Sequence, residues 1–389
     1  MHLLADANLP QFADLVARLQ TQLTQPITLQ TYSERQPSAA QLAQADALFI
    51  RSVTKIDAAL IAQAPRLKWL GTATIGMDHV DQAAVAAAGI IFHSTPGVNA
   101  QAVGDYVACA VAQVNLTQQR PPQGRAAIIG AGHTGRAAGQ RLQGLGYVVH
   151  YYDPPLLESG KAAVAVHADW QQVLTSQVIS CHVPLTSEGP YKTRHLWQYA
   201  DLSQLAPDTV FVNASRGPVV AEADLLRCLQ QRQALSVVLD VWEHEPNLNP
   251  ELLALVKIAT PHIAGHSLAG KLGGSLQLLQ KWLADQQLNA RLPSLPELLA
   301  STAVGRTLQV DSAQAPDWQQ LARWLLQVYD IAADDALLRA APTTASAFDQ
   351  LRRNYAARAE LSQLQVATAN WLDATWQTRF SQLTVQTAR

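Results

Sequence analysis

Short apolar runs alternate with stretches of helical pattern through the first two thirds of the chain. Six of these runs have the length and composition of buried strands: residues 126–129, 147–152, 178–183, 210–213, 237–241 and 257–260. Residues 136–145 and 222–231 have the pattern of helices between such strands. The alternation predicts an α/β fold with a doubly wound parallel sheet, whose ligands bind at the carboxyl ends of the strands.

Two further regions have patterns of their own. Residues 1 to about 100 contain apolar runs at 3–5, 47–50 and 67–71, which predict a smaller α/β unit. Near the other end, an apolar stripe at helical spacing predicts a helix that contributes to a core or a dimer contact: Trp318, Leu321, Trp324, Leu325 and Val328. Residues 291–296 (RLPSLP) are expected to form a linker, and residues 361–368 a strand.

Composition excludes several classes of function. The 389 residues carry a net charge of −2 and are 48% hydrophobic, which favours two or three domains with large cores over a nucleic-acid binder. No apolar run approaches the ~20 residues of a membrane span, and the N-terminus lacks the basic start of a signal peptide. The three scattered cysteines lack metal-like spacing and no HExxH motif occurs, so we expect no metal, buried thiols and a cytoplasmic location.

A glycine-rich turn is the first candidate site. Gly130, Gly132 and Gly135 have the spacing GxGxxG, after a predicted strand and before a predicted helix. In this motif the first glycine permits a tight turn, the second lets the backbone approach a pyrophosphate, and the third lets helix and strand pack closely. The helix N-terminus adds N–H groups and a positive dipole end. This context favours a dinucleotide site over a glycine turn without a ligand.

Asp153 follows the next predicted strand and bears on the choice between the two nicotinamide dinucleotides. Its carboxylate can accept hydrogen bonds from a ribose 2′-hydroxyl and would repel a 2′-phosphate. The residues after it, Pro154, Pro155 and Leu156, offer no cation for such a phosphate. We therefore expect NAD, not NADP, as the cofactor.

Arg216, Glu245 and His262 follow three of the later apolar runs. Neutral imidazole has a suitable pKa near 7, so His262 is the candidate base for the proton of a secondary alcohol. Glu245 would hold the other ring nitrogen, and the planar fork of Arg216 would bind a substrate carboxylate. A hydrogen-bonded structural histidine is the alternative for His262. The nucleotide motif upstream favours the catalytic role, in the oxidation of a 2-hydroxy acid.

Four segments in this order resemble the D-2-hydroxyacid dehydrogenase family: GAGHTG, NASRGPVV, LDVWEHEP and TPHIAGH. Other segments resemble one branch of it, which acts on a 4-phosphorylated hydroxy acid in bacterial vitamin B6 biosynthesis: RSVTK, GTATIGMDHVD, PGVNA, GPYKT, VYDIAADDALLR and FDQLRRNY. The likeness covers essentially the whole chain. It implies a Rossmann-type NAD domain (101–265), a flavodoxin-like substrate domain (1–100 and 266–290) and a small C-terminal α/β domain (291–389) that forms a homodimer.

The resemblance also implies roles for residues. Arg216, Glu245 and His262 match the catalytic trio. The implied cofactor residues are Gly130, Gly132, His133, Thr134, Gly135, Asp153, Val183, Ala214, Ser215, Arg216, Asp240 and Gly265. Ser52 and Thr74 match substrate positions. The candidates for binding the phosphate are Arg51, Ser52 and Lys55, with Arg352 and Arg353 of the tail as further candidates. A returning helix at 268–287 would complete the substrate domain, and closure about the two crossings would exclude water.

Two positions depart from the pattern of that branch. Val183 stands where threonine is usual near the cofactor, and His266 stands where tyrosine is usual near the substrate. Because of these departures, a second hypothesis stays open: a D-2-hydroxyacid dehydrogenase that acts on another small acid, such as a glycerate or lactate analogue. A third hypothesis is a non-enzymatic NAD-sensing corepressor on the same fold, which the intact trio disfavours.

Overall fold

The computed structural model describes residues 1–231, 234–302, 307–356, 358–368 and 371–388. By its internal contacts the chain forms two compact units, one of Met1–Asn99 with Ser267–Gly305 and one of Ala100–His266 with Arg306–Arg389. The chain therefore leaves the first unit after Asn99 and re-enters it at Ser267, directly before the helix expected at 268–287. The division into three domains remains a prediction.

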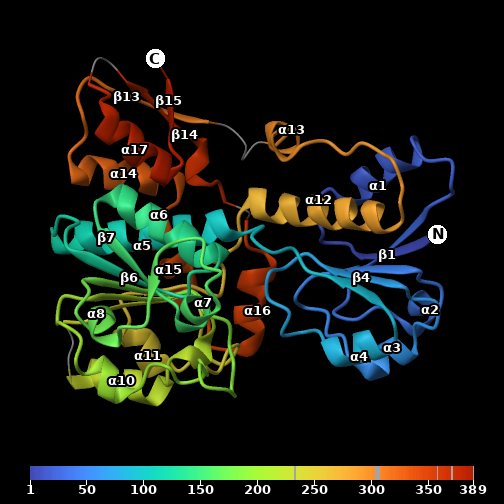
Figure 1. Ribbon diagram of the computed structural model, residues 1–389, viewed down its shortest axis with the longest axis horizontal. Helices are drawn as coiled ribbons and strands as arrows, with labels where there is room; N and C mark the ends of the chain where they lie inside the picture. Colours follow the sequence, from blue (N-terminus) through green and yellow to red (C-terminus); the bar gives the residue numbers. More distant parts are fainter. Residues whose placement is uncertain (232–233, 303–306, 357, 369–370, 389) are drawn as a thin grey trace. The chain divides into compact units, whose positions relative to one another are not determined.

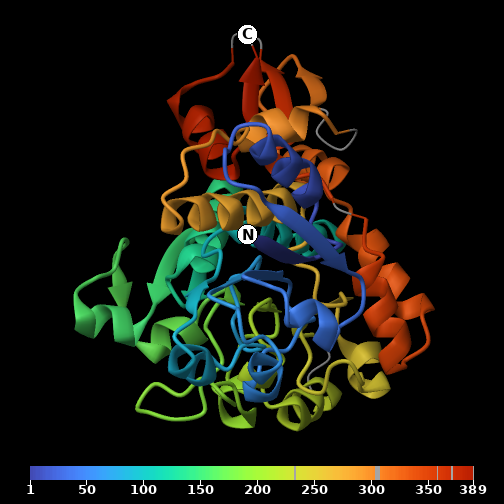
Figure 2. The ribbon, with the colours of Figure 1, turned by 90° about the vertical axis from the view of Figure 1, so that its right-hand side faces the viewer.

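The first unit contains a five-stranded parallel sheet with the order β2-β1-β3-β4-β5, the flavodoxin-like order that the resemblance implied (Figures 1 and 2). Its strands are β1 (His2–Asp6), β2 (Thr28–Tyr32), β3 (Ala47–Ile50), β4 (Trp69–Thr72) and β5 (Ile91–His93). The apolar runs predicted β1, β3 and β4. The edge strand β2 escaped prediction because its sequence, TLQTY, is largely polar, and β5 escaped because it has only three residues.

Helices cover this sheet: α1 (Phe12–Gln20), α2 (Ala39–Leu42), α3 (Ala58–Ala62), α4 (Gln82–Ala87), α12 (Leu268–Asp285) and α13 (Leu295–Ala300). The returning helix α12 is capped by Ser267 and buries Trp282, whose ring lies 6.4 Å from that of Phe49. The prediction of a linker at 291–296 is wrong for its last two residues, which belong to helix α13. Ser294 and Glu297 form a capping box, so α13 begins at Leu295.

The second unit contains a seven-stranded parallel sheet with the order β12-β11-β10-β9-β6-β7-β8. Its strands are β6 (Arg125–Ile129), β7 (Val148–Tyr152), β8 (Val166–His167), β9 (Val178–Cys181), β10 (Val210–Asn213), β11 (Ser236–Leu239) and β12 (Ile258–Ala259). The strand order changes direction between β6 and β9, which is the switch point where doubly wound sheets bind nucleotides. The predicted α/β class and doubly wound sheet are confirmed.

The seven-stranded sheet is called the nucleotide sheet below. Its helices are α5 (Ala100–Gln118), α6 (His133–Leu145), α7 (Pro154–Ser159), α8 (Trp170–Leu174), α9 (Tyr199–Leu202), α10 (Glu222–Gln231) and α11 (Pro250–Leu255), with a 3₁₀ turn at Gly217–Val219. Helix α6 begins at His133, earlier than the predicted 136, because the glycine turn itself supplies the N-cap. Helix α5 is buried over most of its length and packs closely against α6.

The C-terminal segment adds a three-stranded parallel sheet in the order β13-β14-β15, drawn with its helices in orange to red in Figure 1. Its elements are β13 (Leu308–Ser312), α14 (Trp318–Val328), α15 (Ile331–Ala340), α16 (Ala345–Arg353), β14 (Leu364–Thr368), α17 (Ala374–Leu383) and β15 (Gln386–Ala388). The strand predicted at 361–368 is correct only from Leu364, because Leu361–Gln363 forms a 3₁₀ turn. The apolar stripe is α14, and its Trp324 and Leu325 share a core with Ile128 of the nucleotide sheet.

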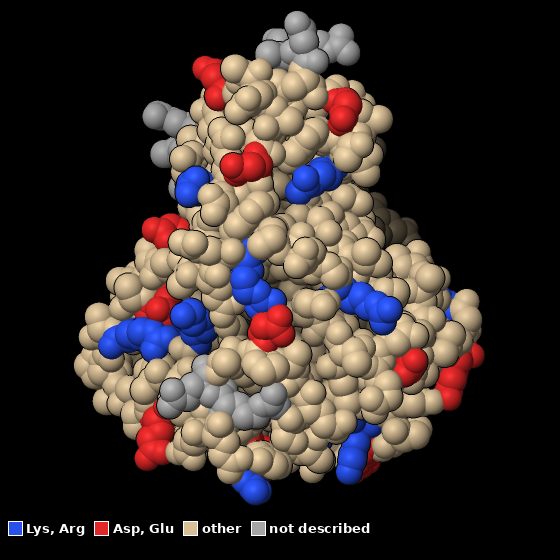
Figure 3. All heavy atoms as spheres, turned by 90° about the vertical axis from the view of Figure 1, so that its left-hand side faces the viewer, with Lys and Arg blue, Asp and Glu red and all other residues tan. Residues whose placement is uncertain are grey.

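Charge is dispersed over the face of the molecule that Figure 3 draws. On the face drawn in Figure 3, basic and acidic side chains are interspersed over a largely uncharged surface, so no broad field of one sign marks this face. Among the described residues, no helix is both long and apolar enough to cross a bilayer.

Candidate functional site

The turn between β6 and α6 has the shape of a phosphate cradle. A Cβ on Gly130 (φ 93°) would lie 2.8 Å from the His182 carbonyl oxygen, and one on Gly135 would lie 1.8 Å from the Gly130 oxygen. At Gly132, by contrast, an added Cβ would meet no described atom within 4 Å. Open space therefore faces the N-terminus of α6, where backbone N–H groups and the dipole favour a pyrophosphate. The cradle fits a dinucleotide.

Asp153 stands between this turn and the end of β7. Its Oδ2 accepts the Ala131 N–H at 2.8 Å and its Oδ1 accepts the Leu156 N–H at 3.0 Å. Each carboxylate oxygen can accept a second hydrogen bond, so these contacts orient the group and leave capacity for a ribose hydroxyl. Val183 also borders the turn, because its Cγ1 lies 3.1 Å from the Cβ position on Gly130.

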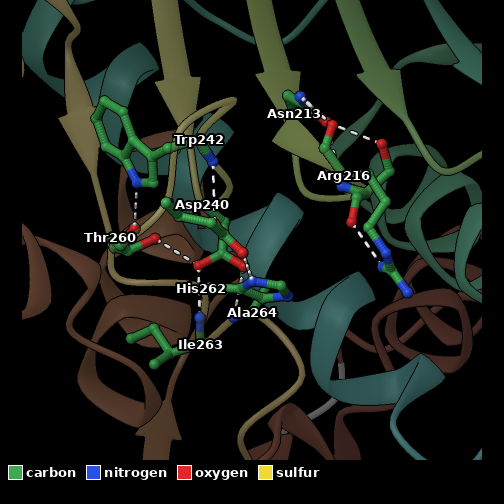
Figure 4. A network of polar contacts seen from close by, with 10 residues as sticks. Asn213, Arg216, Asp240, Trp242, Thr260, His262, Ile263 and Ala264 are labelled. Atoms are coloured by element: carbon green, nitrogen blue, oxygen red, sulfur yellow. Dashed lines mark hydrogen bonds and ion pairs between the residues drawn. The ribbon is translucent and has the colours of Figure 1, made fainter. Parts of the chain in front are cut away.

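Figure 4 shows Arg216, Asp240 and His262 at the carboxyl ends of three strands. Arg216 follows β10, Asp240 follows β11 and His262 follows β12, and these strands are neighbours in the sheet. The Arg216 loop is fixed by Asn213, whose Nδ2 donates to the Arg216 carbonyl at 3.0 Å. The sheet thus brings together a permanent cation and an imidazole that are far apart in the sequence.

His262 and Glu245 form the predicted pair. The imidazole Nδ1 lies 2.6 Å from Glu245 Oε1, and Glu245 Oε2 accepts the Trp242 N–H at 3.2 Å. Burial would raise the pKa of the Glu245 carboxyl, but the charge and hydrogen bond of His262, together with the charge of Arg352, outweigh it and lower the pKa. The carboxylate therefore stays charged beside the ring. The His262 side chain is 28% exposed, so the ring remains accessible.

Asp240 supports the turn that carries His262. Its Oδ1 accepts from the Thr260 hydroxyl and the Ile263 N–H, both at 2.7 Å, and its Oδ2 accepts the Ala264 N–H at 2.9 Å. Burial raises the pKa of this carboxyl. His262 has a left-handed backbone (φ 57°), a conformation that persists where surrounding contacts enforce it. Asp240 holds that turn, and its predicted contact with the cofactor remains a prediction.

The other expected cofactor residues surround the same strand ends. His133 and Thr134 form the first turn of α6. The Ser215 hydroxyl donates to Asn213 Oδ1 at 2.9 Å beside Ala214, while Gly265 lies in the turn after His262. Their contacts with NAD remain predictions.

The expected substrate residues divide between the two units. Arg51, Ser52 and Thr74 belong to the first unit, where Arg51 Nε donates to Asp6 Oδ2 at 2.9 Å and the Thr74 hydroxyl donates to the Gly76 carbonyl at 2.8 Å. His266 belongs to the second unit, with its ring edge-on to Tyr355 at 6.0 Å. A role for these residues in binding substrate remains a prediction.

Sequence reasoning missed the groups that support the histidine turn from further away. The Tyr106 hydroxyl lies 2.8 Å from the Thr260 hydroxyl, and Trp242 Nε1 donates to the Thr260 carbonyl at 3.1 Å. Tyr106 lies 154 positions from Thr260 in the sequence, so no local spacing connects them.

His182 is a second histidine near the cradle, but its environment differs from that of His262. It is 8% exposed, and its Nε2 lies 2.8 Å from the Ser180 hydroxyl. Burial lowers its pKa to about 3, so the ring is neutral near pH 7. Among the described residues, no group of three or more side chains is arranged to bind a metal ion.

Because the pKa of buried His182 is lowered, we expect the protein to lose stability as the pH falls. The unfolded chain protonates the ring near pH 6.5 and the folded chain only near pH 3, so the free energy of unfolding falls as pH decreases through that window. By pH 4.5 the loss from this group reaches about 2–3 kcal/mol. His182→Asn should weaken the decline of Tm between pH 6.5 and 4.5, measured by calorimetry. His244→Asn, at an exposed position, should leave that decline unchanged; equal slopes for the two variants would contradict the assignment.

Comparison with known proteins places the chain in a class. The family profile described as "D-isomer specific 2-hydroxyacid dehydrogenase, NAD binding domain" matches residues 99–264, and a "domain of unknown function" profile matches residues 304–383. An NAD-bound 3-phosphoglycerate dehydrogenase from Entamoeba histolytica has a similar fold (TM-score 0.61, 19% identity, 76% of this chain and 99% of that chain). So does a D-lactate dehydrogenase from Aquifex aeolicus (TM-score 0.58, 21% identity, 74% and 96%). Fold and site define an NAD-dependent dehydrogenase of 2-hydroxy acids.

Relatives with higher sequence identity to this chain show which branch of the class it belongs to. Erythronate-4-phosphate dehydrogenases are 43% identical in Idiomarina loihiensis (91% of this chain, 90% of the relative), 38% in Shewanella halifaxensis (97% of each) and 40% in Escherichia coli O127:H6 (94% of each). The chain belongs to the erythronate-4-phosphate dehydrogenase family. The branch expected from the sequence motifs is confirmed.

Proposed function

We propose that the chain oxidises 4-phospho-D-erythronate to 2-oxo-3-hydroxy-4-phosphobutanoate with NAD, in the biosynthesis of pyridoxal 5′-phosphate. The observation that carries this proposal is the His262–Glu245 pair, at 2.6 Å, on the sheet edge that also presents Arg216. Relatives with 38–43% identity over nearly the whole chain support the choice of substrate.

The residues of the chain account for the proton and the carboxylate. When the His262 Nδ1–H donates a hydrogen bond to Glu245, Nε2 is unprotonated and can accept the proton of the substrate 2-hydroxyl. The Glu245 carboxylate then stabilises the imidazolium that forms. Arg216 provides a permanent charge and a planar fork for the substrate carboxylate. NAD supplies the acceptor for the hydride from C2.

Recognition of the 4-phosphate is assigned to Arg51, with Ser52 and Thr74. Asp6 is 2% exposed and binds Arg51 Nε, which fixes the direction of the guanidinium, and the Arg51 side chain is 30% exposed. A fixed arginine with accessible surface suits a phosphate, which accepts paired N–H groups. Support for this assignment comes from the RSVTK and GTAT segments and from this geometry.

The proposal predicts NADH formation with 4-phospho-D-erythronate and a much lower kcat/KM with unphosphorylated D-erythronate. Arg51→Ala should lower kcat/KM for the phosphorylated substrate by about 10–100-fold, since a charge-assisted contact contributes about 1.5–3 kcal/mol. It should change the value for D-erythronate by less than about threefold. Both are measured as initial rates of NADH formation at 340 nm.

Arg66→Ala is the matched control, because Arg66 is also paired with an aspartate, Asp46, at 2.9 Å in the same unit. It should leave both substrates unaffected. Equal losses for both substrates in Arg51→Ala would contradict the phosphate assignment. Preference of the wild type for glycerate or lactate would favour another 2-hydroxyacid dehydrogenase, and NAD binding without any turnover would favour an NAD sensor.

We also propose that the chain forms a homodimer through its C-terminal segment and resides in the cytoplasm. Resemblance to the family supports the dimer. Three buried cysteines outside any disulfide support a reducing compartment: Cys109, Cys181 and Cys228.

A further inference from the structure

Arg358 is a buried cation that binds the loop following His262. It lies in the C-terminal segment, beyond α16, and is 8% exposed. Its Nη1 donates to the carbonyls of Ile263 (2.9 Å) and His266 (3.3 Å), and its Nη2 donates to those of Ala264 (2.6 Å) and Ala102 (2.8 Å). Three of these four acceptors lie within the four residues after the proposed base.

The guanidinium itself is fixed from the other side. Its carbon lies 4.1 Å from the ring centre of Tyr329, a cation–π distance. The Tyr329 hydroxyl donates to Asp334 Oδ2 at 2.9 Å, and the Tyr355 hydroxyl donates to the same oxygen at 2.7 Å. Arg358 therefore has little freedom to follow the loop if the loop moves, because the C-terminal helices hold it in place.

Both the N–H groups and the carbonyl groups of the loop after His262 are bound by side chains. The Asp240 carboxylate accepts the N–H groups of Ile263 and Ala264, while Arg358 binds the carbonyls of the same two residues. These four contacts fix the peptide groups directly after His262. They explain how a left-handed backbone persists at His262, and hence how the direction of its ring is set.

The same C-terminal segment also holds the chain before His262. Asp335 Oδ1 accepts the Ala259 N–H at 2.7 Å, and Arg339 donates to the carbonyls of Leu253 (2.6 Å) and Val256 (2.9 Å). Strand β12 and the histidine turn are therefore bound from both ends by one segment.

We propose that Arg358 is a positioning residue for the reaction, which sets the His262 ring through the 263–266 loop of its own chain. This inference rests on the proposed role of His262 as the base. The C-terminal segment then contributes to catalysis within each chain. A displacement of about 1 Å in a catalytic group can cost about 10²-fold in rate, so small changes at Arg358 should be visible in kcat.

The test compares Arg358→Lys with Arg379→Lys. Arg379 is a matched control in the same segment: it donates to the carbonyls of Gly144 (2.9 Å) and Leu145 (3.0 Å) and lies 4.3 Å over the ring of Trp376. Arg358→Lys keeps the charge but loses the fork, and should lower kcat by about 10–100-fold. Arg379→Lys should change kcat by less than about twofold at a comparable shift of Tm.

Two readouts separate positioning from a loss of folded protein. With substrate deuterated at C2, the isotope effect on kcat should increase in Arg358→Lys, because the chemical step becomes slower, whereas a smaller active fraction leaves it unchanged. In protein with histidine labelled at Cε1, the NMR signal of His262 is the one that disappears in His262→Gln. This signal should shift in Arg358→Lys and not in Arg379→Lys. Identical kcat, isotope effect and resonance in the two variants would overturn the inference.

The proposed function can fail separately. If the wild type oxidises no hydroxy acid, the His262 resonance still shows whether Arg358 sets the ring. If Arg358→Lys does not fold, Tyr329→Leu removes the ring beneath the guanidinium and should reproduce the lower kcat and the shifted resonance. A folded Tyr329→Leu with wild-type values of both would count against the inference.

Discussion

His262→Ala should lower kcat for oxidation of the hydroxy acid by about 10²–10⁴-fold, the contribution of a positioned general base. The imidazole is the group that the structure orients for proton transfer, with Nδ1 at 2.6 Å from Glu245 and the ring partly exposed. NAD binding should persist, because the cradle at Gly130–Gly135 does not depend on this ring. Stopped-flow measurement of NADH formation and fluorescence titration of NADH binding together check both expectations.

His93→Ala is the matched control. His93 also pairs with a carboxylate, Asp285, at 2.7 Å, and the exposed fractions of the two side chains (30% and 27%) nearly equal those of His262 and Glu245 (28% and 25%). His93→Ala therefore removes a partly exposed imidazole–carboxylate pair of the same kind, but in the first unit. Turnover should stay within about twofold of wild type. Substantial activity in His262→Ala would remove the proposed base and with it the mechanism.

The second large effect is expected at Arg216. Arg216→Ala should lower kcat/KM by about 10²–10³-fold, because two charge-assisted hydrogen bonds to the substrate carboxylate are lost. Arg216→Lys should recover part of this loss, since it keeps the charge without the planar fork. Steady-state kinetics with varied hydroxy acid at saturating NAD measure both variants.

Arg227→Ala serves as the control for Arg216. Arg227 belongs to α10 of the same unit and lies 4.0 Å over the ring of Tyr199, so its removal also deletes a cation with a packing role. Its kcat/KM should match wild type. Were Arg216→Ala to retain more than about a third of wild-type kcat/KM, another group would have to bind the carboxylate.

The sequence predicted most of the parallel sheet because a buried parallel strand is a continuous apolar run. Strands β10 and β3 were predicted to the residue, and helix α10 likewise. The polar strand β2 has no such run, and only Val166 of the apolar run at 162–166 belongs to the two-residue strand β8. Both strands therefore depend on pairing with neighbours that only the folded chain provides.

The candidate site was predictable where its chemistry is local. The glycine turn, Asp153 and the Glu245–His262 pair follow from spacing within motifs. The contacts of Asp240 with Ile263 and Ala264 were not predicted, because a carboxylate at a strand end is equally suited to a ligand or to backbone N–H groups. Arg358 lies 94 positions from Ala264, and the sequence around it has no periodicity that points to the turn.

Helix α14 and the nucleotide sheet contribute to one hydrophobic core, which has a consequence for the evolution and engineering of this family. Recombination between relatives at three boundaries, Asn99–Ala100, His266–Ser267 and Gly305–Arg306, would exchange the first unit with most of its internal contacts intact. Exchange of the C-terminal segment alone would instead join surfaces that evolved apart, at Leu325 and Ile128 among others. Productive chimeras should therefore inherit the nucleotide sheet and the C-terminal segment from the same parent.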